Sequence, residues 1–152
     1  MGPLQEAWRV FDMASAKTKS RSMSANGRSS KSKFWTYSKL LHAIPDHPDY
    51  ISLDKTSRAL LWDMFRQYNG YNNGNISAAH GVMCKWGWDK KTLLRCRKKL
   101  EEAGWIVVTR IPRAKKEPTL YAFSWLEIDT WEGKPYLDAG VENIPLKSLR
   151  PK

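Results

Sequence analysis

The stretch from Ser77 to Gly104 constrains the fold more than any other, because it carries start and stop signals for two consecutive helices. Ser77 can cap a short helix of sequence AAHGVMCKW, which Gly87 closes. Asp89 can cap a second helix that runs to about Ala103, and Gly104 stands where a left-handed residue ends a helix. The sequence therefore predicts two helices joined by a tight turn.

The second of these helices is predicted to be amphipathic. Small or apolar side chains that repeat at core spacing are Leu93, Cys96, Leu100 and Ala103. Charged side chains that fall on the opposite face are Lys91, Arg95, Lys98 and Glu102. One face is therefore expected to lie on the core, and the other to face solvent or a partner.

A further helix is predicted upstream of this pair. Ser52 or Asp54 can cap it, and its apolar stripe continues to about Tyr68. The segment PDHPDY before it is predicted to be a turn-rich loop. YNGYNNGN at residues 68–75 can only be a connection, because Asn-Gly pairs favour the left-handed conformations of tight turns.

A β-hairpin with a positively charged tip is predicted after the helix pair. WIVVTRI at 105–111 is rich in β-branched residues, and TLYAFSW at 119–125 alternates and returns. Between them, PRAKKEP forms a basic loop bounded by prolines. This order of elements over residues 53–125 is that of a winged helix-turn-helix, a mainly α fold with a small β-hairpin wing.

Segments outside this domain differ in composition. Residues 1–33 hold a short amphipathic stretch and a Ser-, Lys- and Arg-rich stretch that has almost nothing to bury and is predicted to be a disordered basic arm. Residues 126–152 mix apolar residues with prolines and glycines, which favours an irregular C-terminal extension. The winged helix-turn-helix domain is expected at residues 34–125.

The formal net charge is +11, and it has two sources. Residues 14–33 carry six basic side chains and no acid, whereas residues 89–116 carry ten basic side chains and three acids. The rest of the chain is slightly acidic. Such a distribution favours a polyanionic partner.

Several classes of function are disfavoured. Apolar runs are far shorter than the roughly 20 residues of a membrane span, so no membrane association is expected. Cys84 and Cys96 make neither a disulfide framework nor a zinc module, which fits a reducing cytoplasm. His80 and Cys84 stand four residues apart, but nothing nearby supplies two further ligands, so we expect no metal or other cofactor. The chain has no enzyme signature, so catalysis is not expected.

The tryptophans at apolar positions or element ends are expected in the core rather than on stacked bases. They are Trp35, Trp62, Trp86, Trp88, Trp105 and Trp125. Trp88, in the turn before the second helix, is the one best placed to stack on a base.

The run GNISAAHGVMCKWGWDKKTLLRCRKKLEEAGWIVVTR at 74–110 resembles the small helix-turn-helix proteins of phages, prophages and integrative elements. It shares their capped helix, Gly-centred turn, Thr-Leu-x-Arg recognition helix and Leu-Glu-x-x-Gly end before a wing strand. YNGYNNG at 68–74, YSKLL, SLDKTSRALLWDMF and YAFSW fit the same family. The resemblance covers about residues 34–129. It implies a sequence-specific duplex DNA-binding protein of a phage or mobile element, acting as a transcription regulator or replication initiator.

The DNA-binding residues are expected on the second helix and the hairpin. Exposed residues in the first two turns of a recognition helix can reach base edges in the major groove. Base reading is therefore expected of Lys90, Lys91, Thr92 and Arg95, with Arg95 the best candidate for a guanine. Phosphate or wing contacts are expected of Lys98, Lys99, Arg110, Arg113, Lys115 and Lys116.

Other functions stay open. A phage-encoded interaction protein that inhibits a host defence or nucleic-acid-handling complex would bind a host protein, with Trp8, Phe11 and Trp131 as anchors. RNA or ribosome binding is also open, and the basic arm at residues 14–33 is the only independent feature that favours it. The arm is either a solvated linker or a segment that binds along a DNA groove, with Arg21 and Arg28 in a narrow minor groove. A homodimer is also open, and the expected location is the host cytoplasm, at the nucleoid.

Overall fold

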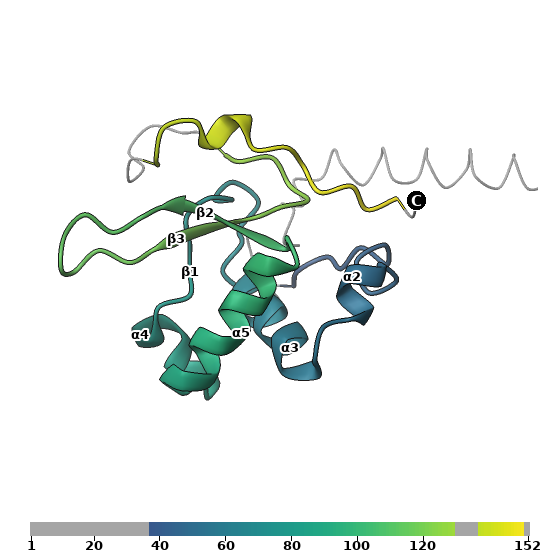
Figure 1. The fold of residues 1–152 in the computed structure, drawn as a ribbon, viewed down its shortest axis with the longest axis horizontal. Helices are drawn as coiled ribbons and strands as arrows, with labels where there is room; N and C mark the ends of the chain where they lie inside the picture. Colours follow the sequence, from purple (N-terminus) through teal and green to yellow (C-terminus); the bar gives the residue numbers. More distant parts are fainter. Residues whose placement is uncertain (1–36, 130–136, 151–152) are drawn as a thin grey trace, which may run out of the picture. The chain divides into compact units, whose positions relative to one another are not determined.

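The computed structural model describes residues 37–129 and 137–150, and all the helices and strands described belong to the compact unit Leu40–Lys152 (Figure 1). In chain order these elements are α2 (Pro48–Ile51), α3 (Lys55–Phe65), β1 (Ile76–Ser77), α4 (His80–Met83), the 3-10 helix η2 (Cys84–Trp86), α5 (Lys90–Glu102), β2 (Ile106–Arg110), β3 (Leu120–Phe123) and the 3-10 helix η3 (Val141–Asn143). The described unit is an α/β mixture rather than mainly α.

The three strands form one antiparallel sheet in the order β1-β3-β2. The predicted hairpin of β2 and β3 is confirmed, and it pairs Ile106 with Phe123 and Val108 with Tyr121. Strand β1 was not predicted. It pairs Ile76 with Tyr121 on the other edge of β3, and its two residues are too few to show an alternating pattern.

Strand β1 also explains why the first predicted helix starts late. Ser77 pairs with Leu120 in the sheet, so its backbone is extended and it does not cap a helix at residue 78 as predicted. Its Oγ accepts a hydrogen bond from the backbone N–H of Ala79 (3.2 Å), and α4 begins only at His80. The helix then tightens into η2 and ends at Gly87, whose φ of +86° is left-handed as expected.

Helix α5 begins and ends close to where the sequence predicts. Asp89 Oδ2 accepts the backbone N–H of Thr92 (2.9 Å), which satisfies one of the free donors at the helix start. At the other end Gly104 has φ +74°, and the backbone N–H of Trp105 donates to the carbonyl of Leu100 (2.9 Å). Both signals are local, which is why the sequence identifies them correctly.

The segment before α3 was predicted to be a loop but contains helix α2. Pro48 occupies its first turn, where a missing N–H has no cost, and His47 Nδ1 accepts the N–H of Asp49 (3.1 Å) as a cap. Helix α3 follows Asp54 and ends at Phe65, three residues before the expected Tyr68.

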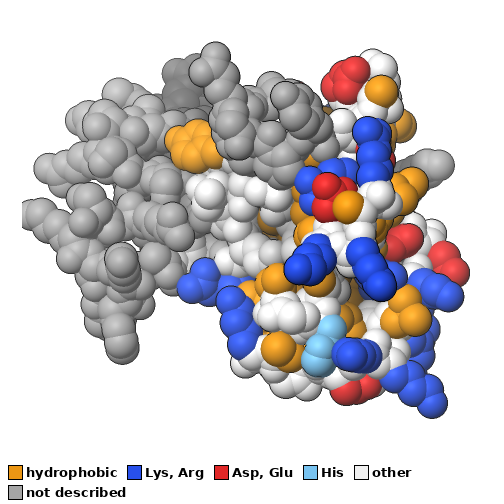
Figure 2. All heavy atoms as spheres, turned by 90° about the vertical axis from the view of Figure 1, so that its left-hand side faces the viewer, with side chains coloured by type: hydrophobic (Ala, Val, Ile, Leu, Met, Phe, Trp, Pro, Cys, Tyr) orange, Lys and Arg blue, Asp and Glu red, His pale blue; other side chains and the backbone are white. Residues whose placement is uncertain are grey.

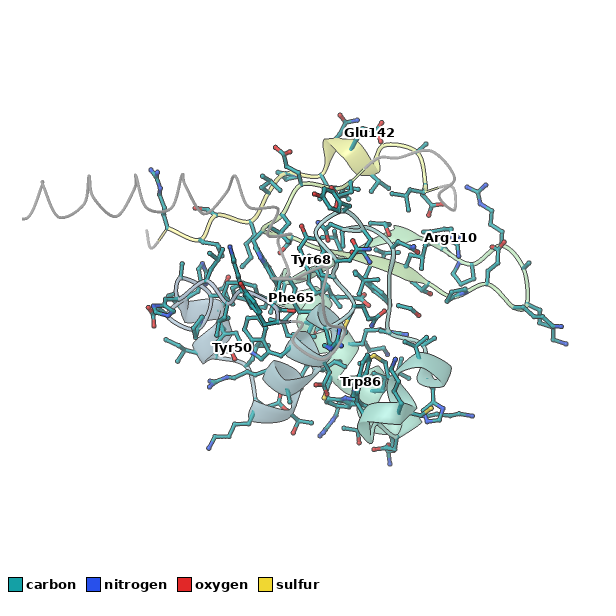
Figure 3. All side chains as sticks on the ribbon, turned by 180° about the vertical axis from the view of Figure 1, so that it is seen from behind. Tyr50, Phe65, Tyr68, Trp86, Arg110 and Glu142 are labelled. Carbon is teal, nitrogen blue, oxygen red and sulfur yellow. The ribbon has the colours of Figure 1, made fainter. Side chains whose placement is uncertain are left out.

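Helices α3 and α5 lie on one side of the sheet, and residues 137–150 run along the other (Figure 1). Trp105 and Trp125 are buried between these elements, with ring centroids 5.8 Å apart. Phe65 of α3 reaches the sheet at Phe123, 5.0 Å away between centroids (Figure 3). Fully buried aliphatic and sulfur-containing side chains complete the core: Ile44, Leu60, Leu61, Met64, Ile76, Met83, Cys96 and Leu100. The helix pair is thus fixed to the sheet by a continuous apolar core.

The connection at residues 68–75 is held by a buried asparagine. The Asn73 side-chain N–H groups donate to the carbonyls of Phe123, Leu126 and Glu127, and its Oδ1 accepts the N–H of Phe123 (2.7 Å). At the next residue, Gly74 has φ +111°, and a Cβ there would lie 3.1 Å from Ile128. The connection at residues 68–75 is therefore fixed to the end of β3 by hydrogen bonds.

A β-bulge interrupts β2 just before the tip of the hairpin. Val108 pairs with Tyr121 and Arg110 pairs with Leu120, so Thr109 is an extra residue with no partner in the ladder. Thr109 is fully buried, and its hydroxyl donates to the carbonyl of Gly74 (2.7 Å).

Asp138 and Lys147 connect residues 137–150 to the rest of the unit. Asp138 donates its backbone N–H to Thr109 O (2.8 Å) and accepts the N–H of Ile111 through Oδ2 (2.8 Å). Lys147 Nζ lies 2.5 Å from Asp49 of α2 and 4.8 Å from the centroid of the Trp105 ring. Glu142, in η3, lies on this side of the sheet (Figure 3).

Candidate nucleic-acid interface

Helix α5 separates its apolar and basic residues onto opposite faces. Leu93, Cys96 and Leu100 are buried against α3 and the sheet. Because successive residues of an α-helix are about 100° apart, one outward face is shared by five residues, all exposed: Lys91, Leu94, Arg95, Lys98 and Glu102. The predicted two-faced helix is confirmed, and its basic face is open to solvent.

The first turn of α5 presents two exposed lysines beside the carboxylate of Asp89, which caps the helix. Lys90 and Lys91 are exposed, whereas Thr92 is half-buried. The backbone N–H of Thr92 lowers the pKa of Asp89 below its usual value, so this carboxylate stays ionised at the helix start. Its charge opposes binding of a phosphate by the helix terminus, and attraction of an anion therefore depends on the lysine side chains.

Two of the predicted phosphate-binding residues, Lys99 and Arg110, are half-buried and make contacts within the protein. Lys99 Nζ lies 3.4 Å from Asp54 Oδ1, so it links α5 to the start of α3. Arg110 is half-buried and donates to the carbonyl of Pro118 across the hairpin (3.4 Å). Figure 3 shows Arg110 at the base of the hairpin. Both side chains are less available to a partner than Lys98, which is exposed on the outward face.

The hairpin loop, residues 111–119, is exposed from residue 111 to 117. Arg113 forms an ion pair with Asp138 (Nη2 to Oδ1, 3.2 Å) while 79% of its side chain remains exposed. Lys115 and Lys116 form no ion pair with any residue in the described part of the chain. The loop extends beyond the sheet (Figure 1), and Arg113, Lys115 and Lys116 in it are exposed.

Figure 2 views the molecule from the side on which the hairpin loop projects in Figure 1. Lys and Arg side chains are spread over the described part of this face, with hydrophobic side chains between them. An additional cation not predicted as a site residue is Lys85 of η2, exposed and 4.2 Å from the centroid of the Trp86 ring. Its position in the last turn of the first predicted helix, next to the predicted recognition helix, could have identified it as a candidate.

Contacts within the protein fix the orientation of the Trp88 side chain. It packs against the core, and its indole N–H donates to Asp63 Oδ2 of α3 (2.7 Å), which fixes the start of α5 relative to α3. These contacts favour a structural role over base stacking. Trp105 and Trp125 are buried and Trp62 and Trp86 are partly buried against the same core, as predicted. Trp35 lies outside the described residues.

Among the residues that the structure describes, His80 and Cys84 are not joined by further metal ligands. Cys84 is exposed, and its Sγ lies 3.7 Å from the carbonyl oxygen of Gly81. Within residues 37–129 and 137–150, no three His, Cys, Asp or Glu side chains gather where they could hold a metal ion. The helices of these same residues are all too short or too polar to cross a bilayer.

Several candidate residues lie outside the described part of the chain: Trp8, Phe11, Arg21, Arg28 and Trp131. No protein-family model, curated protein or solved structure matches this chain.

Proposed function

We propose that this protein binds double-stranded DNA in a sequence-specific manner through a winged helix-turn-helix. The order α3, β1, α4, α5, β2, loop and β3 supports this assignment, as does a sheet in which β3 lies between β1 and β2. In this arrangement α5 is the recognition helix and the hairpin loop is the wing.

Helix α5 has the dimensions and charge that insertion into the major groove requires. Its 13 residues span about 20 Å, and its width matches the groove. Arg95 can donate two parallel hydrogen bonds to O6 and N7 of guanine, which distinguishes this base from the other three. Lys90, Lys91 and Thr92 are placed in the first turn to read a base edge or hold a phosphate.

The hairpin loop supplies contacts that position the helix. Arg113, Lys115 and Lys116 are long, exposed cations suited to phosphates or the edge of the minor groove. Lys98 extends the phosphate-binding surface along α5. Lys99 and Arg110 contribute mainly through the contacts that they make within the protein.

The observation that carries the proposal is the exposed basic face of α5, whose opposite face is buried in the core. The test is to select duplexes from a random pool with the full chain, then measure affinity for the selected site at several salt concentrations. With about six phosphate contacts, log affinity should fall against log salt with a slope near −5. Binding that ignores salt, or that shows no sequence preference, would contradict the proposal.

We further propose a role as transcription regulator or replication initiator of a phage or mobile element, acting in the host cytoplasm at the nucleoid. This role rests on the resemblance carried by residues 74–110, and fold alone does not decide between the two. Mapping of bound sites in the host cell distinguishes them, because a regulator occupies promoters and an initiator occupies a repeated origin sequence. Stable capture of a host protein without a preferred duplex would favour the inhibitor function.

A further inference from the structure

Leu94 is an apolar side chain in the middle of the charged face of α5. Its side chain is 45% exposed. Its neighbours in sequence are the buried Leu93 and the exposed Arg95. Within the described part of the chain, Leu94 belongs neither to the core nor to the side chains packed against it. Its apolar surface is therefore available to a partner.

The position of Leu94 on the helix relates it directly to Arg95. At about 100° per residue, Leu94 and Arg95 lie about 50° to either side of the line joining Lys91 and Lys98. Those two lysines are about 10 Å apart along the axis, which corresponds to three base-pair steps of about 3.4 Å. Leu94 and Arg95 thus face the same three or four base pairs if α5 enters the major groove.

We propose that Leu94 is a specificity-determining residue that contacts the 5-methyl group of a thymine in the major groove. The inference rests on the proposed function, because it requires α5 to face bases. The thymine methyl is the apolar group that base edges present in this groove. Lys91 and Lys98 are attracted to phosphates on the two sides of the groove. These two contacts would hold Leu94, which lies between them, against the bases. The bound site would then contain a thymine within the three or four base pairs that include the guanine read by Arg95.

The experiment removes the methyl group from the DNA and the side chain from the protein in turn. In the selected duplex, each thymine is replaced singly by uracil, which lacks only the 5-methyl group and keeps its base pairing. At one of these positions, the replacement is expected to lower the affinity of the full chain about three- to fourfold. This factor corresponds to the loss of burial of one methyl group. Leu94→Ala should bind the thymine and uracil duplexes equally.

A matched control is Leu146→Ala, which truncates a leucine of similar exposure (52%) in the segment on the other side of the sheet. This variant should keep the full preference for thymine. Thermal unfolding of both variants checks that each remains folded.

The outcomes separate this inference from the function on which it rests. A sequence-preferring protein that tolerates uracil at every position, or whose thymine preference survives in Leu94→Ala, overturns the role of Leu94 and leaves DNA binding intact. A protein that selects no duplex overturns both. Loss of the thymine preference in Leu94→Ala alone supports the inference.

Discussion

Helix α5 and the hairpin loop are both basic, but the protein holds them in different ways. The helix is capped by Asp89, ended at Gly104 and fixed along its length by buried side chains such as Leu100. The loop is fixed mainly at its base, where Asp138 contacts Ile111 and Arg113. A fixed surface can distinguish one hydrogen-bonding pattern from another, whereas a freely placed lysine can follow any phosphate. This difference supports the proposal that the helix reads bases and that the loop positions the helix on the duplex.

The largest expected effect tests whether the core fixes the helix. Leu100→Ala removes a fully buried side chain and should lower the free energy of unfolding by about 2–5 kcal/mol. Leu94→Ala is the matched control, because it truncates the same residue type on the exposed face and should change that free energy by less than about 0.5 kcal/mol. Denaturant unfolding measures both. Equal losses would mean that the two faces of α5 are not distinct.

The next effect concerns base reading. Arg95→Ala should weaken binding to the selected duplex by about 1–3 kcal/mol and relax the preference at one base pair. Fluorescence anisotropy against the selected site and its single-base variants measures this change. Equal weakening for every duplex would reduce Arg95 to a phosphate contact and remove the difference between helix and loop.

The loop should behave in the opposite manner. Lys115→Ala is expected to lower affinity by the same factor for all sequences and to reduce the salt slope by about one, because one fewer counterion is released. Salt titrations with specific and non-specific duplexes provide the measurement. A slope equal to that of the unaltered protein would place the loop outside the interface.

The smallest expected effect separates two neighbouring lysines. Lys98→Ala should weaken DNA binding, whereas Lys99→Ala should mainly remove the surface ion pair with Asp54, worth at most about 1 kcal/mol of stability. DNA titrations and denaturant unfolding of both variants measure these effects. A larger loss of DNA affinity in Lys99→Ala than in Lys98→Ala would reverse the assignment.

The same ion pair should have a pH signature. The Ser57 hydroxyl and then Lys99 lower the pKa of Asp54 below its ordinary value of 3.8, with burial opposing them. A lowered pKa means that the ionised carboxylate stabilises the fold above about pH 4, and that this contribution is lost as pH falls further. Unfolding measured between neutral and acid pH should therefore show a smaller acid-induced loss in Lys99→Ala than in the unaltered protein.

The parts of the molecule that sequence could predict are those whose signals are local. The start and end of α5 depend on Asp89 and Gly104, and both act within one turn of the helix. Strand β1 could not be predicted, because Ile76 is extended only through its pairing with Tyr121, far away in the sequence. Helix α2 was missed since Pro48 and the residues around it are equally typical of turns.

The candidate site shows the same limit. Helical spacing alone places Lys91, Arg95 and Lys98 on one exposed face. It cannot show that the neighbouring Lys99 meets Asp54, because that carboxylate comes from another helix. Nor does it reveal the role of Asn73, whose hydrogen bonds reach residues about fifty positions later.

The bulge at Thr109 affects the direction in which the hairpin loop projects, whereas the charge of the loop comes from residues further along the chain. One additional residue on β2 bends and twists the ribbon just before it leaves the sheet, so the angle at which the tip projects is set at that point. The cations that would meet a phosphate stand several residues further on. A deletion at position 109 would therefore change the direction of the tip while Lys115 and Lys116 stay unchanged, and in the proposed complex the tip would meet a different part of the duplex. A change in the length of this strand alone would therefore redirect the loop without altering its composition.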